Sequence, residues 1–284
     1  MSGFINRLND IFLYMKEPLI VGVLLSLCAS IIGVVLVLKR YSMIGDGLSH
    51  VGFGALATAL ALNLAPLQLA IPVVIISAYI LLRIGESTKI KGDAAIALIS
   101  SSALAIGYLF GSLTKGFTAD INNYMFGSIT TATKADLYMI LPLSAIIIVV
   151  FVFTYNRIFS VTFDSSFAKA TGVHTKSYNV LLAILTAIVV VIGMRVMGTL
   201  LISSLIIFPA LSSMRVFNNF KKVIFSSALI SIFCFLVAFI GFTKFSSAAT
   251  IVIVNLFVFI IFTTIGFIIR KIKRYQKKDD SIIR

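Results

Sequence analysis

Charged residues are scarce in this sequence, and their scarcity limits the class of protein. Asp, Glu, Lys and Arg make up 12% of the 284 residues, whereas 60% are hydrophobic. A soluble domain carries about 25% charged residues. A chain with half that share needs an apolar solvent around it, and a lipid bilayer supplies one. The composition therefore predicts an integral membrane protein and excludes an ordinary soluble domain.

Several signals of chemistry are also missing. The two cysteines, Cys28 and Cys234, lie far apart in apolar runs, which predicts small buried side chains rather than a disulfide or a Cys-x-x-Cys metal site. There is no Gly-x-x-x-x-Gly-Lys-Ser/Thr loop, so an ATPase that drives this chain must be another polypeptide. There is also no His-Glu-x-x-His motif of a zinc protease. We therefore do not expect an enzyme, and we expect no permanently bound cofactor.

Long apolar runs fill most of the chain, each near the length that crosses the hydrocarbon core. They predict an all-α polytopic helix bundle that forms one transmembrane domain over residues 1–284. Only Gly198 separates the sixth run from the seventh, so the number of spans is left at eight or nine. The nine runs are 18–38, 43–65, 67–84, 94–112, 137–155, 178–197, 199–214, 222–242 and 248–270.

The net charge of +14 is distributed unevenly between the connections. With nine spans, 18 of the 24 Lys and Arg residues fall on one side and six on the other. Because positively charged loops stay in the cytoplasm, this pattern predicts a cell-membrane protein with its N-terminus outside and its C-terminus inside. It does not favour nucleic acid as a partner. The cytoplasmic segments would be 39–42, 83–93, 156–177, 215–222 and the tail after residue 269.

The two ends of the chain carry their own predictions. Residues 1–17 mix charged and apolar residues, which predicts an interfacial N-terminal segment rather than a cleavable signal. Residues 271–284 are rich in Lys and Arg, which predicts a basic cytoplasmic tail beside the lipid surface.

The candidate metal ligands are Asp46 and His50, within the segment 39–54, KRYSMIGDGLSHVGFG. Four residues apart on a helix, they share one face. A carboxylate and an imidazole at that spacing can bind one divalent metal ion. An ionised Asp inside a membrane helix costs about 2.5–3.5 kcal/mol, so it normally faces a polar path or partner. The alternative is that the two side chains simply pair with each other or with the backbone.

The segment 163–176, FDSSFAKATGVHTK, is the second candidate for function. Asp164 and the two serines after it are typical of a helix start, and Gly172 is typical of a stop. The pattern predicts a short helix that docks on a soluble partner, with an ordinary connecting loop as the alternative. His174 would lie outside the membrane, so we do not expect it to bind transported metal.

A third segment, 193–215, combines small residues with Pro209. Small residues allow close helix contacts in lipid, and the proline can break or kink a span. Arg195 is expected near the outer end, where its side chain reaches water.

Taken together, these segments resemble the metal-uptake permease family of ABC transporters, which imports zinc, manganese or iron. The resemblance extends over nearly the whole chain. One departure is the sequence 208–213, FPALSS, where the family often has Leu-Pro-Ala-Ala-Thr-Ala. The matching segments are LVLKRYSMIGDGLSHVGFG at 36–54, YMFGSI at 124–129, FDSSFAKATGV at 163–173, GTLLISSLIIFPALSSMRV at 198–216 and SSAATIVIV at 246–254.

The resemblance implies an assembly and roles for particular residues. It implies a homodimeric permease that works with two ATPase subunits and an extracytoplasmic metal-binding protein. It implies that Asp46 and His50 line the metal path. It also implies that 163–176 is the segment coupled to the ATPase, with Asp164, Phe167, Lys169 and Gly172 as its candidate residues.

Two alternatives remain open at this point. Subfamily resemblance favours Zn²⁺ as the transported substrate, whereas one imidazole and one carboxylate suit both Zn²⁺ and Mn²⁺, and iron is the third candidate. The rival from another class is an ATP-independent metal channel or secondary transporter, which binding of the ATPase would distinguish.

Overall fold

The computed structural model describes residues 15–87, 92–112, 127, 129–241 and 247–282, and every regular element in these ranges is a helix. The all-α prediction is confirmed. The predicted interfacial segment lies almost wholly outside the described residues. The helices are α2 (Lys16–Leu38), α3 (Ile44–Ala61), α4 (Pro66–Ser87), α5 (Gly92–Gly111), η1 (Ile129–Thr131), α7 (Lys134–Phe163), α8 (Ser165–Ala170), α9 (Thr175–Met197), α10 (Thr199–Val216), α11 (Phe220–Gly241) and α12 (Ser247–Ile282).

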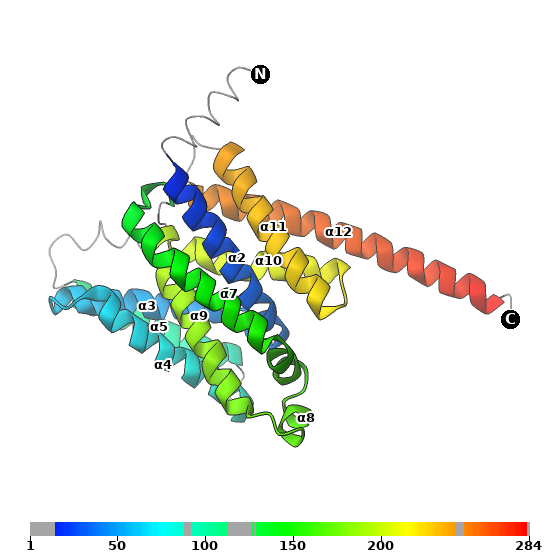
Figure 1. The fold of residues 1–284 in the computed structure, drawn as a ribbon, viewed down its shortest axis with the longest axis horizontal. Helices are drawn as coiled ribbons and strands as arrows, with labels where there is room; N and C mark the ends of the chain where they lie inside the picture. Colours follow the sequence, from blue (N-terminus) through cyan, green and yellow to red (C-terminus); the bar gives the residue numbers. More distant parts are fainter. Residues whose placement is uncertain (1–14, 88–91, 113–126, 128, 242–246, 283–284) are drawn as a thin grey trace, which may run out of the picture.

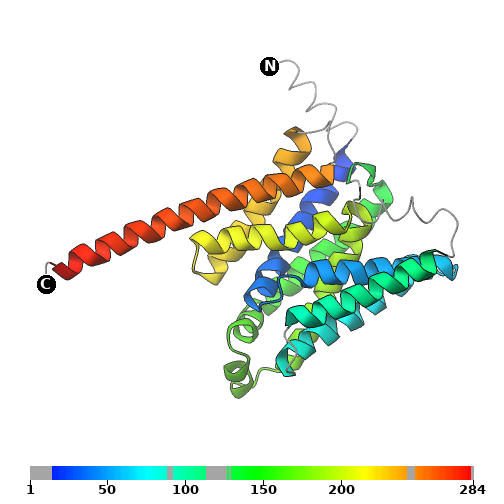
Figure 2. The ribbon, with the colours of Figure 1, turned by 180° about the vertical axis from the view of Figure 1, so that it is seen from behind.

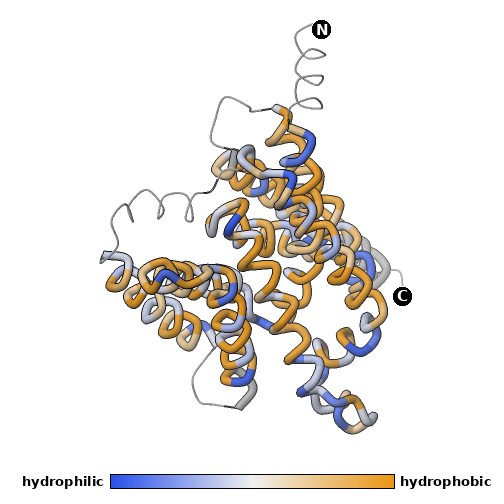
Figure 3. The backbone as a smooth tube through the Cα atoms, turned by 60° about the vertical axis from the view of Figure 1, so that its left-hand side comes forward, coloured by the Kyte–Doolittle hydropathy of each residue, from blue (hydrophilic) through white to orange (hydrophobic). Residues whose placement is uncertain are grey.

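The helices form two groups around α2 and α9, which are largely buried (Figure 1). Helices α3, α4 and α5 lie together on one side of the molecule, while α7, α10 and α11 surround α2 on the other. Helix α12 packs along α10 and then projects beyond the bundle, as the view from behind shows (Figure 2). Apolar residues dominate along the helices, and the strongly hydrophilic residues gather mainly near their ends (Figure 3).

Eight of the described helices are long and apolar enough to cross a membrane, and the ninth long helix, α3, is not among them. Its 18 residues span roughly 27 Å, close to the thickness of the hydrocarbon core. Asp46, His50 and four glycines make α3 more polar than its neighbours. Most of α3 is buried, and its contacts are with α4, α5, α9 and α10, so it is shielded from lipid and does not need an apolar surface.

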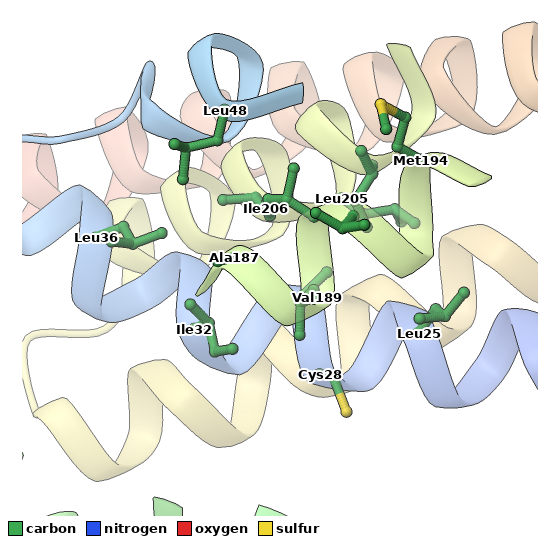
Figure 4. Close-up of a cluster of buried hydrophobic side chains, with 14 of the residues drawn as sticks. Leu25, Cys28, Ile32, Leu36, Leu48, Ala187, Val189, Met194, Leu205 and Ile206 are labelled. Atoms are coloured by element: carbon green, nitrogen blue, oxygen red, sulfur yellow. The ribbon is translucent and has the colours of Figure 1, made fainter. Parts of the chain in front are cut away.

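The buried core joins residues that are distant in sequence. Figure 4 shows Leu25, Cys28, Ile32 and Leu36 of α2 beside side chains of α3, α9 and α10. Cys28 is 1% exposed, and both cysteines are free and buried. The prediction that they are small core side chains is confirmed. Helix packing is close here, because a Cβ added to Gly33 of α2 would lie 2.0 Å from the carbonyl oxygen of Ile206 in α10.

The structure decides three points about helix ends and breaks that the sequence had left open or placed elsewhere. Helix α7 continues to Phe163, eight residues past the predicted end at 155, because apolar residues at helical spacing continue beyond the polar pair Asn156 and Arg157. Pro209 lies inside α10 without ending it. Gly198 does separate two helices, and its φ of +86° lies in a region that favours glycine.

The basic connections meet at one end of the bundle. The hydroxyl of Tyr41, between α2 and α3, donates a hydrogen bond of 3.2 Å to the carbonyl oxygen of Leu82 near the end of α4. The rings of Tyr155, Phe159 and Phe163 near the end of α7 all pack on Phe220 at the start of α11. A pocket lined by 38–41, 161–163 and Ser165 links these two contacts, so the described parts of four connections that were assigned to one side by charge lie at the same end.

Candidate metal site and coupling segment

A tight backbone turn leads into the helix that carries the candidate ligands. After α2 ends, the amide of Tyr41 donates to the carbonyl of Leu36 at 2.9 Å, and the amide of Arg40 donates to that of Val37 at 3.0 Å. This pair of bonds is the Schellman motif. In this motif the residue after the helix C-cap, here Arg40, adopts the left-handed conformation. Arg40 adopts φ +65°, a conformation usually left to glycine. The turn fixes where α3 begins, at Ile44.

Asp46 lies in the first turn of α3 and His50 one turn later. Asp46 Oδ2 lies 3.7 Å from His50 Nε2, and the side chains are 42% and 26% exposed respectively. That distance is longer than a hydrogen bond. The two polar groups therefore face each other without a direct hydrogen bond, and both keep lone pairs that can bind a ligand. The partial positive charge at a helix start favours the Asp46 carboxylate. The predicted shared face of Asp46 and His50 is confirmed.

The pair lies in a groove of about 470 Å³ between α3 and α5. Asp93, Ser100 and Ser101 of α5 supply the other polar groups of its wall. Small residues bring the two helices together, because a Cβ added to Gly54 of α3 would lie 2.3 Å from the carbonyl oxygen of Ala103. The groove is therefore a mostly apolar cleft between closely packed helices, with a few polar groups gathered around the pair.

The pair can supply two ligands to a metal ion. Zinc lies about 2.1 Å from nitrogen and oxygen ligands. An ion at that distance from both atoms would make an angle of about 120° with atoms 3.7 Å apart, which suits a three- or four-ligand site. Among the described residues no group of three or more His, Cys, Asp or Glu side chains could hold a metal ion. Water, groups from other spans or a second polypeptide could supply the remaining ligands.

The predicted short helix at 163–176 is present as α8. Oδ1 of Asp164 accepts hydrogen bonds of 2.9 Å from the amides of both Ser166 and Phe167, which caps the helix start. Gly172 follows the helix with φ +82°, and nothing lies within 4 Å of a Cβ added there. The expected helix start and stop are confirmed.

One face of α8 is anchored and the other is open. Ala168 packs with Val161, Val173 and Tyr178 in a small apolar cluster. Phe167 is 63% exposed, and Lys169 is exposed beside it. An exposed aromatic ring and a cation on a short anchored helix suit contact with a soluble partner.

The α8 segment adjoins the turn that leads into α3. A pocket of about 360 Å³ is lined by 38–41 on one wall and by 161–163 and Ser165 on the other. Lys39 also reaches across to Asn179 near the start of α9. The α8 segment and the turn that leads to Asp46 therefore face each other across this pocket. Asn179 and the α5 residues Asp93, Ser100 and Ser101 were missed by sequence reasoning, although three consecutive serines at 100–102 in an apolar run were a visible signal.

Arg195 lies at the opposite end of the bundle, as expected. Its guanidinium is 3.7 Å from the carboxylate of Asp136 at the start of α7. Asp136 also forms a capping box with Thr133, so the arginine is tied to a well-defined helix start.

These features define a class of protein, namely a polytopic helical membrane protein with a polar pair exposed in a groove and a short helix with an exposed face at one end. The chain belongs to the ABC 3 transport family, whose model matches residues 12–266. This membership confirms the family resemblance read from the sequence motifs.

Two relatives illustrate the range of named substrates. The chain is 28% identical over 280 residues to the manganese import system permease protein ScaB of Streptococcus gordonii, covering 98% of this chain and 99% of the relative. It is 28% identical over 212 residues to the high-affinity zinc uptake system membrane protein ZnuB of Buchnera aphidicola, covering 74% and 81%.

Solved structures agree with this assignment. The fold is similar to a chain of PsaBC from Streptococcus pneumoniae in complex with Fab, with a TM-score of 0.80, 28% identity, and 92% of this chain and 94% of that chain covered. A putative metal-chelate type ABC transporter in an inward-facing conformation shares the fold at a TM-score of 0.71, with 15% identity.

Proposed function

We propose that the chain is the membrane-spanning permease subunit of an ATP-driven importer for a divalent transition-metal ion, with Asp46 and His50 in the ion path. The observation that carries the proposal is the 3.7 Å pair on the wall of an accessible groove in a family of transporters. Two ligands per chain form an incomplete site, and an incomplete site suits transport because the ion must be released.

The assembly we propose follows from that incompleteness. The groove that holds the pair is lined by Met43 and by residues of α3 and α5, with none from α4 or α9, so a second copy of the chain, water or the ion's hydration shell can complete the coordination. Cytoplasmic ATPase subunits would dock on Phe167 and Lys169 of α8, and an extracytoplasmic metal-binding protein would deliver the ion at the end that holds Arg195. The basic end of the bundle is then cytoplasmic.

Zn²⁺ is our first candidate for the transported substrate, on the resemblance to zinc permeases. Mn²⁺ is the second, and it is favoured by the carboxylate ligand and by the near full-length match to a manganese permease. Competition between the two ions in one assay separates the candidates.

The test is uptake by the reconstituted complex. The permease is inserted into vesicles with its ATPase and metal-binding protein, and Zn²⁺ and Mn²⁺ accumulation is measured with ATP and with a non-hydrolysable analogue. We expect accumulation only with ATP. Equal uptake without the ATPase or with the analogue would contradict an ATP-driven importer and favour the channel or secondary transporter.

A further inference from the structure

A second groove lies on the opposite side of the molecule from Asp46 and His50. It has a volume of about 620 Å³ and is walled by α2, α7 and α11, with no residue from α3 or α5. Its lining is apolar except at one end. The lining residues are Leu27, Ile31, Tyr155, Lys221, Lys222, Ile224, Phe225, Ala228, Leu229 and Ile232.

The dimensions of the groove match one leaflet of a bilayer. From Lys221 to Ile232 it follows 12 residues of α11, whose 11 steps rise roughly 16 Å along the helix axis. Half of the hydrocarbon core is about 15 Å thick. The apolar part is therefore about as long as one layer of lipid chains is thick, and in a bilayer the two lysines would lie near the headgroups.

The charges at the mouth of the groove are of one sign. Lys221 and Lys222 are exposed, and among the described residues neither makes an ion pair. The helices that form the groove carry only Glu17 and Asp136, each at the far end of its helix. Asp164, which follows the end of α7, already accepts hydrogen bonds from two backbone amides of α8. The mouth thus offers positive charge to an anion.

Aromatic side chains mark the same level. Tyr155 lines the groove, and its ring centroid lies 5.4 Å from that of Phe220, which directly precedes the two lysines. Tyrosine is enriched where membrane meets water, because its ring is apolar and its hydroxyl is polar. The groove therefore has an apolar body, an interfacial ring and a cationic mouth in the order that a phospholipid requires.

We propose that this groove binds an anionic phospholipid from the surrounding leaflet, with an acyl chain along α11 and the phosphate group at Lys221 and Lys222. Basic pockets between transmembrane helices bind lipid headgroups of this charge. A second copy of the chain is disfavoured as the occupant, because two lysines from each copy would approach each other without a carboxylate partner. The proposal does not depend on which ion is transported.

The absence of tryptophan from this chain allows a direct test. Phe225→Trp places a single reporter in the groove, and Phe153→Trp places a matched reporter on the outer surface of α7; the native side chains are 68% and 85% exposed. Position 153 is two residues from Tyr155, so it lies at similar depth but on another face of the helix. Both variants are reconstituted in phosphatidylcholine vesicles that contain a small fraction of brominated phosphatidylglycerol.

We expect brominated phosphatidylglycerol to quench the groove reporter more strongly than the surface reporter. The difference should correspond to a local phosphatidylglycerol concentration about tenfold higher in the groove, because each lysine attracts the anionic headgroup. With the bromine on phosphatidylcholine instead, the groove reporter should be quenched less than the surface reporter. Lys221→Gln with Lys222→Gln should remove the difference, while Lys176→Gln, an exposed lysine outside the groove, should preserve it.

Three results would overturn the proposal. Equal quenching of the two reporters would mean that the groove is ordinary lipid-facing surface. Loss of the preference in Lys176→Gln would mean that it reflects overall surface charge. Protection of the groove reporter from both brominated lipids would mean that protein, such as a second copy, covers the groove.

Discussion

The ammonium group of Lys39 donates a hydrogen bond of 2.5 Å to Oδ1 of Asn179, joining residues 140 positions apart in the chain. Lys39 ends α2 just before the turn into α3, and Asn179 lies near the start of α9, shortly after α8. The bond therefore ties the turn that precedes α3, the helix of the candidate metal ligands, to the first turns of α9, which follow the segment that we propose meets the ATPase.

Asn179→Leu tests this connection. Hydrogen bonds to a charged group contribute about 1.5–3 kcal/mol, so we expect metal uptake per ATP hydrolysed to fall by roughly tenfold. Uptake and hydrolysis are measured together in reconstituted vesicles. Asn156→Leu, an exposed asparagine of α7, serves as the control and should keep the wild-type ratio. An unchanged ratio in Asn179→Leu would show that the bond has no part in coupling.

Asp46→Asn and His50→Ala should each lower metal uptake by more than about a hundredfold, since even groups behind the ligands alter metal affinity by 10–100-fold. Asp46→Asn keeps the shape and removes the charge, and it also makes membrane insertion easier. His174→Ala removes the only other histidine and should leave metal binding by the purified permease unchanged. Wild-type uptake of both Zn²⁺ and Mn²⁺ in the two variants would make the pair structural.

Lys169→Glu and Gly172→Trp should reduce ATPase stimulation while the permease stays folded. Lys169 is exposed on α8, and apart from the adjoining residues nothing lies within 4 Å of a Cβ added to Gly172, so the new side chains would meet a docked partner rather than the permease itself. Because φ at position 172 is +82°, the tryptophan of Gly172→Trp would carry about 1 kcal/mol of local backbone strain that the glycine does not. Lys134→Glu at the other end of the bundle is the control. Normal metal-stimulated hydrolysis in both α8 variants would refute docking at this helix.

Gly54→Val should separate α3 from α5 and weaken metal binding. A Cβ at position 54 would lie 2.3 Å from a backbone oxygen, which cannot move as a side-chain tip can. Overpacking of this kind costs about 1–3 kcal/mol. Thermal unfolding in detergent measures the loss. Gly241→Ala adds a methyl group where nothing lies within 4 Å, and its melting temperature should match that of the wild type.

Orientation is tested by labelling single cysteines at exposed positions in a chain whose Cys28 and Cys234 are replaced by alanine. Lys169→Cys should react with a membrane-impermeant reagent only after the cells are opened, and Lys134→Cys should react in intact cells. Labelling of position 169 from outside would reverse the orientation that the basic residues predict.

Much of this architecture could be predicted from local sequence, because backbone groups in lipid must be hydrogen-bonded within the same segment. Runs of about 20 apolar residues therefore had to be helices. Asp164 and Gly172 mark the limits of α8 through hydrogen bonds that span only a few residues. The shared face of Asp46 and His50 follows from helical spacing alone.

What surrounds those residues was decided by tertiary structure. The α5 wall of the metal groove, the contact between Lys39 and Asn179, and the lipid-sized groove over α2 each join segments that are distant in the chain. Helices in a bilayer gain little from burying apolar surface against each other, so the fit of small residues and the pairing of polar groups select their neighbours. A one-dimensional pattern determines which segments cross the membrane and where each begins, but that fit depends on the positions of all the helices at once.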